Sequence, residues 1–134
     1  MELVVDANIL FSALIRSAET TQLFYSDKLI LYAPEFLFTE LKEHKEEILL
    51  KSGFSEDDFY LALSLLLSQV HLIPYNEFHE FIQLAKEISP DVDDIEYFAL
   101  AFQLRCSFWT NDKRLKSQNS VNVISTSELL KLMS

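Results

Sequence analysis

Four acidic residues far apart in the chain stand where carboxylates could do chemistry together. They are Asp6, Glu40, Asp94 and Asp112. Carboxylates that gather within a few ångströms repel one another, so a fold keeps such a cluster only where protons or cations neutralise it. Hard oxygen ligands suit Mg²⁺ or Mn²⁺ better than zinc, which prefers His and Cys. A divalent ion held by carboxylates can activate water for attack on a phosphodiester, so metal-assisted hydrolysis is the chemistry that this set could support.

Each of these acids also has a simpler structural interpretation. Asp6 could form a turn at a strand end, and Asp112 could cap the turn that begins at Lys113. Asp94 could be the acid that the dipole favours in the first turn of a helix, and Glu40 could be a solvated helix residue. A common site is favoured only if the elements between the four acids bring them to one place.

Short apolar runs alternate with longer segments of helical period along the chain. Strands are predicted at residues 3–5, 29–33, 71–74, 107–110 and 121–124. Helices are predicted at residues 8–17, 20–27, 34 to about 50, 55–69, 77–88, 90–104 and 125–132. This alternation indicates an α/β fold, a three-layer α/β/α sandwich with a central parallel sheet. The length of 134 residues fits a single domain, residues 1–134.

Parallel sheets place functional residues beyond the carboxyl ends of their strands, near the switch in strand order. Asp6 directly follows the first strand, and Asp112 comes two residues after Thr110 at the end of the fourth. These two ends are neighbours if the first and fourth strands flank the centre of the sheet. Glu40 comes from the helix after the second strand, and Asp94 from the helix that leads into the fourth. All four acids are therefore expected at one edge of the sheet.

Acidic residues outnumber basic ones by 21 to 11, which gives a net charge of −10. This is the wrong sign for a protein that grips phosphates with Lys and Arg, unless many acids converge on metal ions that reverse the local field. The single glycine, Gly53, excludes the glycine-rich loops that cradle nucleotides, and the single cysteine, Cys106, excludes an internal disulfide. The acidic start is unlike a signal peptide and no apolar stretch is long enough for a bilayer, so we expect no membrane association and a cytoplasmic location.

Four motifs carry a resemblance to a known family. They are Val4-Val5-Asp6-Ala7-Asn8-Ile9-Leu10, Thr39-Glu40-Leu41, Asp94-Ile95-Glu96-Tyr97-Phe98-Ala99-Leu100-Ala101 and Trp109-Thr110-Asn111-Asp112. In order and rough spacing they resemble those of a PIN domain, over nearly the whole chain. The resemblance implies a five-stranded parallel sheet in the order 3-2-1-4-5. It also implies a Mg²⁺- or Mn²⁺-dependent ribonuclease that cuts single-stranded or structured RNA.

The resemblance also implies roles for individual residues. The four acids of the family, which would be both metal ligands and catalytic residues, match Asp6, Glu40, Asp94 and Asp112. The residues that would support them are Asn8, Thr110 and Asn111. Asp93 is an alternative for the third acid. Asp94 keeps the spacing to residues 99–101, whereas Asp93 would point about 100° away around the helix.

Many small PIN domains that this chain resembles are VapC-type toxins, each neutralised by a cognate antitoxin protein. The resemblance therefore implies an RNA substrate and an antitoxin partner, and the alternative is a non-catalytic PIN module that binds RNA or a protein. Candidate contacts to RNA are Arg16, Lys113 and Arg114. Residues 59–67 are apolar on nearly all sides of their predicted helix, which indicates burial at a homodimer interface.

Overall fold

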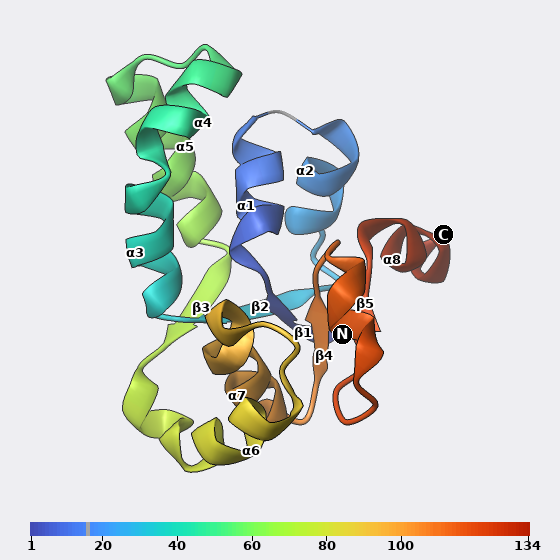
Figure 1. Ribbon diagram of the computed structural model, residues 1–134. Helices are drawn as coiled ribbons and strands as arrows, with labels where there is room; N and C mark the ends of the chain where they lie inside the picture. Colours follow the sequence, from blue (N-terminus) through green and yellow to red (C-terminus); the bar gives the residue numbers. More distant parts are fainter. Residues whose placement is uncertain (16) are drawn as a thin grey trace.

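A single sheet of five parallel strands forms the centre of residues 1–15 and 17–134, the part of the chain that the structure describes. The computed structural model has these strands in the order β3-β2-β1-β4-β5 (Figure 1). They are β1 (Glu2–Val5), β2 (Ile30–Pro34), β3 (Val70–Ile73), β4 (Ser107–Trp109) and β5 (Val123–Ile124). The strand number, direction and order predicted from the resemblance are confirmed.

The carboxyl ends of β1 and β4 lie side by side. Val5 is opposite Trp109 in the parallel register, so the next residues along the two strands, Asp6 and Thr110, leave the sheet together. The backbone N–H of Asp6 donates to the carbonyl oxygen of Trp109 at 3.0 Å, which extends the pairing by one residue. The neighbouring strand ends expected from the sequence are therefore present.

Eight α-helices flank the sheet within the described residues. They are α1 (Ala7–Leu14), α2 (Ala18–Phe24), α3 (Phe36–Glu43), α4 (Lys45–Ser52), α5 (Glu56–Leu67), α6 (Ile82–Ile88), α7 (Ile95–Leu104) and α8 (Thr126–Met133). Figure 1 shows α1 to α5 on one side of the sheet and α6 and α7 on the other. This arrangement confirms the predicted three layers.

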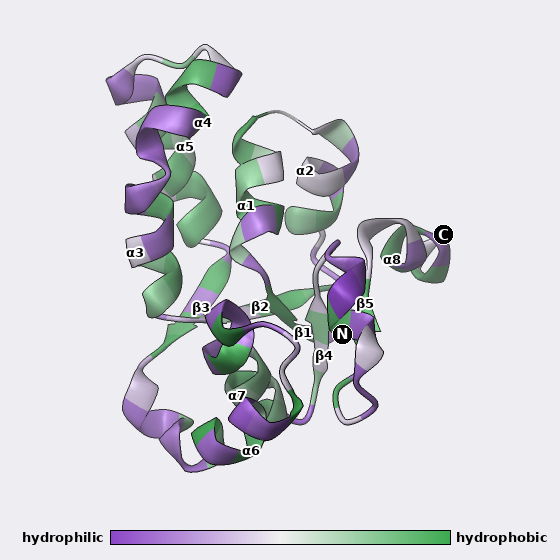
Figure 2. Cartoon of the chain, in the orientation of Figure 1, coloured by the Kyte–Doolittle hydropathy of each residue, from purple (hydrophilic) through white to green (hydrophobic). Residues whose placement is uncertain are grey.

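The two faces of the sheet are covered by the most apolar helices. Helix α7 packs against β1, β2 and β4 through its buried residues 97–101. Figure 2 shows mostly hydrophobic residues on α1 and α7, whereas α3 and α4 carry hydrophilic residues as well. Leu3, Val4 and Val5 of β1 are fully buried, because a central parallel strand has a helix layer against each face.

Pro34 does not open the helix after the second strand, as the sequence suggested. It is the last residue of β2 and pairs with Ile73 of β3. A strand end tolerates proline because little of the sheet's hydrogen bonding depends on its missing N–H. The helical segment then begins at Phe36 and divides at His44, whose backbone (φ −98°, ψ 10°) leaves the helical region between α3 and α4.

The helix predicted at residues 77–88 is only half α-helical. Two 3₁₀ turns, Tyr75–Glu77 and His79–Phe81, precede α6. Phe78 lies between them with a non-helical backbone and a fully buried ring, so its packing interrupts the helix. At α8 the predicted capping box is present, since Ser125 and Glu128 each bond the other's backbone N–H.

Candidate active site

Asp6 is a buried carboxylate held in place by two donors. It ends β1 and caps α1, where one carboxylate oxygen accepts the backbone N–H of Asn8 at 3.4 Å. The other oxygen accepts the hydroxyl of Thr110 at 2.6 Å. Only 5% of the residue is exposed, and this burial raises the pKa of Asp6, while the bonds from Thr110 and Asn8 lower it. Asp6 therefore caps a helix at the strand end where its simpler interpretation placed a turn, and it also faces a second strand end.

Thr110 connects two of the predicted site acids. Its buried hydroxyl donates to Asp6 and accepts the backbone N–H of Asp112 at 3.1 Å. The side-chain oxygen of the next residue, Asn111, accepts the backbone N–H of Thr126 at 2.8 Å and ties the loop after β4 to the start of α8. Of the three predicted supporting residues, Asn8 donates its backbone N–H to Asp6, and Thr110 bonds Asp6 and Asp112 through its hydroxyl. Asn111 supports the loop after β4 through its side-chain oxygen.

If the acids carry the metal-dependent RNA cleavage that the sequence leads us to expect, replacement of Thr110 by Val should lower it by about tenfold, as loss of a partner that orients a metal ligand does elsewhere. Valine has nearly the shape of threonine but cannot donate to Asp6 or accept from Asp112. Thr110→Ser keeps the hydroxyl and is the matched control. Steady-state cleavage of a labelled RNA measures the effect. Equal rates for the two variants would show that the hydroxyl does not position the acids.

Glu40 lies in the second turn of α3 and is bonded across the sheet edge to α7. The hydroxyl of Tyr97 donates to its carboxylate at 2.6 Å. The pKa of Glu40 is raised to about 7, first by burial and further by the Asp6 and Asp93 carboxylates, while the Tyr97 bond lowers it. Tyr97 was not among the residues expected at the site. The available signal was its position three residues after Asp94, a spacing at which side chains at the start of a helix share one face.

Asp94 ends a 3₁₀ turn (Val92–Asp94) at the N-terminus of α7. It occupies the N-terminal capping position without a capping hydrogen bond, and a carboxylate there still interacts favourably with the helix dipole, as its simpler interpretation has it. Its pKa is raised to about 7, first by burial and then by nearby carboxylates. These are Asp6, Asp91, Asp112 and Glu40. The structure thus brings all four predicted acids close enough to affect one another.

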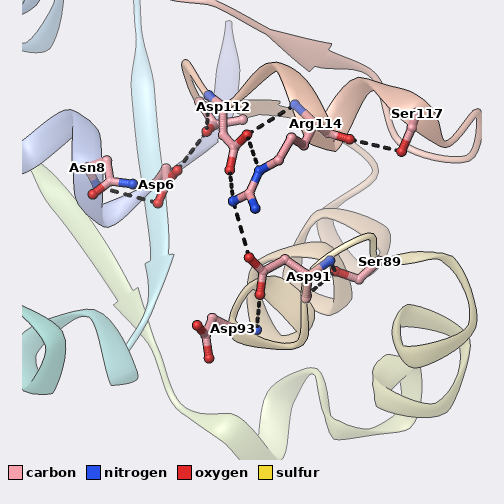
Figure 3. A network of polar contacts seen from close by, with 9 residues as sticks. Asp6, Asn8, Ser89, Asp91, Asp93, Asp112, Arg114 and Ser117 are labelled. Carbon is pink, nitrogen blue, oxygen red and sulfur yellow. Dashed lines mark hydrogen bonds and ion pairs between the residues drawn. The ribbon is translucent and has the colours of Figure 1, made fainter.

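The neighbouring acid, Asp93, occupies a different environment. It is exposed, and its backbone N–H donates to Asp91 at 2.9 Å (Figure 3). Asp94 is half-buried and interacts electrostatically with three predicted site acids, whereas Asp93 contributes to the raised pKa of Glu40. The geometry favours Asp94 as the third member of the group.

Asp112 is paired with a guanidinium. It caps a 3₁₀ helix (Lys113–Ser117), and Arg114 donates to both of its carboxylate oxygens, at 3.0 and 2.7 Å. The same guanidinium reaches Asp91 at 3.3 Å, so it bridges two loops (Figure 3). These bonds hold the pKa of Asp112 below its usual range. Arg114, predicted as an RNA contact, therefore neutralises a site carboxylate, although its side chain remains 72% exposed.

Of the other two predicted RNA contacts, Lys113 and Arg16, the structure describes only Lys113. Lys113 is exposed beside Asp112, at the edge of the acidic group. Arg16 lies outside the described residues.

The donor set fits a hard divalent ion in its chemistry. All four acids offer carboxylate oxygens, and their mutual repulsion, which adds to burial in raising the pKa values of Glu40 and Asp94, is what a cation would relieve. In the part of the chain that the structure describes, however, no three Asp, Glu, His or Cys side chains are already arranged to hold an ion together. Ion binding would require side chains to turn, with Arg114 releasing Asp112, both of whose carboxylate oxygens it now engages.

A doubly wound parallel sheet with carboxylates gathered at the ends of its central strands defines a class of α/β proteins with a site at the switch point. Within this class, residues 4–130 match the model of the PIN domain family, and the chain belongs to that family. PIN domains are generally nucleases and typically use divalent metals. Comparison with curated proteins gives no significant match.

Proposed function

We propose that this chain is a metal-dependent endoribonuclease whose ion is held by Asp6, Glu40, Asp94 and Asp112. The observation that carries the proposal is the electrostatic effect of three of these acids on the fourth. Asp6, Asp112 and Glu40 each raise the pKa of Asp94, although they come from different elements of the fold. Like charges are gathered in this way at sites that bind cations or handle protons.

The chain's own residues would prepare the site in three ways. Thr110 and the backbone of Asn8 fix the carboxylate of Asp6, which limits the reorganisation needed when substrate arrives. Tyr97 orients Glu40 from the opposite helix. Arg114, once released from Asp112, would offer a planar donor pair to a phosphate, with Lys113 beside it and Arg16 as a further candidate contact. A bound Mg²⁺ or Mn²⁺ would supply Lewis acidity and an activated water for hydrolysis of the phosphodiester.

The third acid can be tested with two neighbouring residues as a matched pair. We expect Asp94→Asn to lower RNA cleavage in Mg²⁺ or Mn²⁺ by about a hundredfold and Asp93→Asn to leave it nearly unchanged, because Asp94 is the half-buried member of the pair. EDTA should abolish cleavage by the unaltered protein. Cleavage of a labelled single-stranded RNA provides the measurement. A larger loss of cleavage in Asp93→Asn than in Asp94→Asn would make Asp93 the third ligand. Unchanged cleavage in both variants would refute the proposed ligand set.

In the alternative function, this chain is a non-catalytic PIN module that binds RNA or a protein partner and does not cleave RNA. The retention of all four acids in one place favours the nuclease, because a binding module has no use for their mutual repulsion. Calorimetric titration with Mn²⁺ separates the two functions. A nuclease should bind Mn²⁺ with an affinity that Asp94→Asn weakens, and a non-catalytic module should show no carboxylate-dependent binding.

We extend the proposal to a cytoplasmic toxin, formed by residues 1–134 as one PIN domain and neutralised by an antitoxin. A gene for such an antitoxin beside the gene for this chain would support the extension. No described helix has the length and apolar character needed to cross a membrane. Helix α5 buries Phe59, Leu63 and Leu66 within the chain and exposes Tyr60, Leu61 and Leu65, so a homodimer through this outer face remains part of the proposal.

A further inference from the structure

A separate hollow of about 530 Å³ lies next to the acids, between the start of α3, the 3₁₀ turn after β3 and the first turn of α7. Its volume is in the range of sites that take small organic groups. Two of its lining residues adjoin the proposed ligands in sequence: Thr39 precedes Glu40, and Glu96 follows Asp94 by two positions. The hollow therefore begins where the acidic group ends.

Three aromatic side chains in this hollow are unusually open to solvent. Phe36, Phe38 and Tyr75 are 39%, 38% and 52% exposed. Rings displayed beside a phosphodiester-cleaving site can stack with the bases of a single strand, since every base offers an apolar face. The ammonium of Lys42 stands 4.5 Å from the centre of the Phe38 ring, where it could meet a phosphate of the same strand.

Two carboxylates complete the hollow, Glu35 at its exposed rim and the half-buried Glu96. They would repel a phosphate, so the part of a nucleotide that fits between them is the base. A carboxylate accepts hydrogen bonds from an exocyclic amine, such as that of cytosine. Uracil has no exocyclic amine, and a carbonyl oxygen stands on each side of its single N–H. These carbonyl oxygens would face the carboxylate oxygens, and acceptors cannot bond one another.

We propose that this hollow binds an unpaired nucleobase of the RNA, one position from the scissile phosphate, and prefers bases with an exocyclic amine over uracil. The inference rests on the proposed nuclease function, because that function brings a single strand to Glu40 and Asp94. Stacking comes from Phe36, Phe38 and Tyr75, and the discrimination against uracil comes mainly from Glu96, the less solvated of the two carboxylates. The nucleotide preference of the enzyme would then depend on a region outside the metal ligands.

The stacking role is tested by binding in EDTA, so that no RNA is cut. Fluorescence anisotropy measures the affinity of the full chain for labelled oligocytidine, oligoadenosine and oligouridine. We expect Phe38→Leu to weaken binding to oligocytidine and oligoadenosine by about tenfold and Phe38→Tyr to retain it. Tyr25→Leu is the matched control, since Tyr25 is an exposed aromatic residue that does not line the hollow.

The base preference is tested with Glu96→Gln, which keeps the side-chain shape but offers a donor as well as an acceptor. We expect it to reduce the preference for oligocytidine over oligouridine by about tenfold, and in Mg²⁺ to change KM rather than kcat. The inference is overturned if Phe38→Leu and Glu96→Gln bind all three oligonucleotides as the unaltered protein does. The hollow would then serve another occupant, such as a basic protein segment. A failure of the nuclease proposal is distinct, because it appears as intact binding in EDTA without any cleavage in Mg²⁺ or Mn²⁺.

Discussion

Replacement of Asp6 by Asn is expected to lower the rate of RNA cleavage in Mg²⁺ on the order of 10³-fold, the upper range for removing one preorganised electrostatic group. Asp6 is the most buried of the four acids, and its two hydrogen-bond donors hold it in one orientation. Asparagine keeps the size of the side chain but cannot carry the negative charge that attracts an ion. The measurement is kcat/KM on a labelled RNA.

Two controls separate this loss from unfolding. Asp27→Asn removes an exposed acid from the turn before β2, at the opposite edge of the sheet, and should leave cleavage unchanged. Thermal melting of Asp6→Asn at pH 8 should give a Tm no lower than that of the unaltered protein, because the variant removes a buried charge whose desolvation is unfavourable. Cleavage by Asp6→Asn at the rate of the Asp27→Asn control would refute the role of Asp6.

The metal-free protein is expected to lose stability as the pH rises from 5 to 8. The pKa values of Glu40 and Asp94 are raised to about 7 in the folded protein, from ordinary values of 4.5 and 3.8. Between these limits the folded state binds more protons than the unfolded state, so the free energy of unfolding falls as pH rises. A loss of about 1 kcal/mol lowers the Tm of a chain of this size by about 4 °C, and we expect at least this change.

Divalent ions should reverse this loss. Mn²⁺ at a hundredfold excess over its dissociation constant adds about 2.7 kcal/mol to the free energy of unfolding, and the gain should be larger at pH 8 than at pH 5 because the ligands must be deprotonated. Melting curves with and without Mn²⁺ test both statements. Asp94→Asn should flatten the dependence on pH, since it removes one of the two titrating groups. A Tm that neither pH nor Mn²⁺ changes would show that the acids do not form a site.

Local patterns predicted most of the fold. Fully apolar runs such as residues 3–5 became buried strands, because a parallel sheet covered by helices on both faces requires apolar side chains on both faces. Errors arose where tertiary contacts decide the outcome. Pro34 joins β2 because Ile73 pairs with it, and Phe78 breaks a periodic segment because its ring is buried. Neither partner is visible from the spacing of residues along the chain.

The membership of the candidate site stays a prediction, and the hydrogen bonds of its members were not foreseen from the sequence. Asp6 and Asp112 could be named because each follows the end of a strand in a doubly wound sheet. Asp94 was named from its spacing within a family motif, and Glu40 mainly from the family resemblance. Tyr97 and Arg114 could not be assigned in the same way, since the first bonds Glu40 across 57 positions and the second was expected to contact RNA instead of Asp112. Both bonds depend on side-chain direction, which sequence spacing does not give.

The hydrogen bond between Thr110 and Asp6 spans 104 positions, and it has a consequence for synthesis of the protein on the ribosome. β1 lies between β2 and β4, so the central strand lacks one of its two neighbours until residues 107–109 have emerged from the exit tunnel. Asp6 is translated 104 positions before its partner Thr110, and Asp112 follows Thr110 by two residues. A nascent chain therefore carries an incomplete set of acids until residues 107–112 have left the tunnel. Strand order thus delays assembly of the proposed site, and with it any cleavage of RNA close to the ribosome.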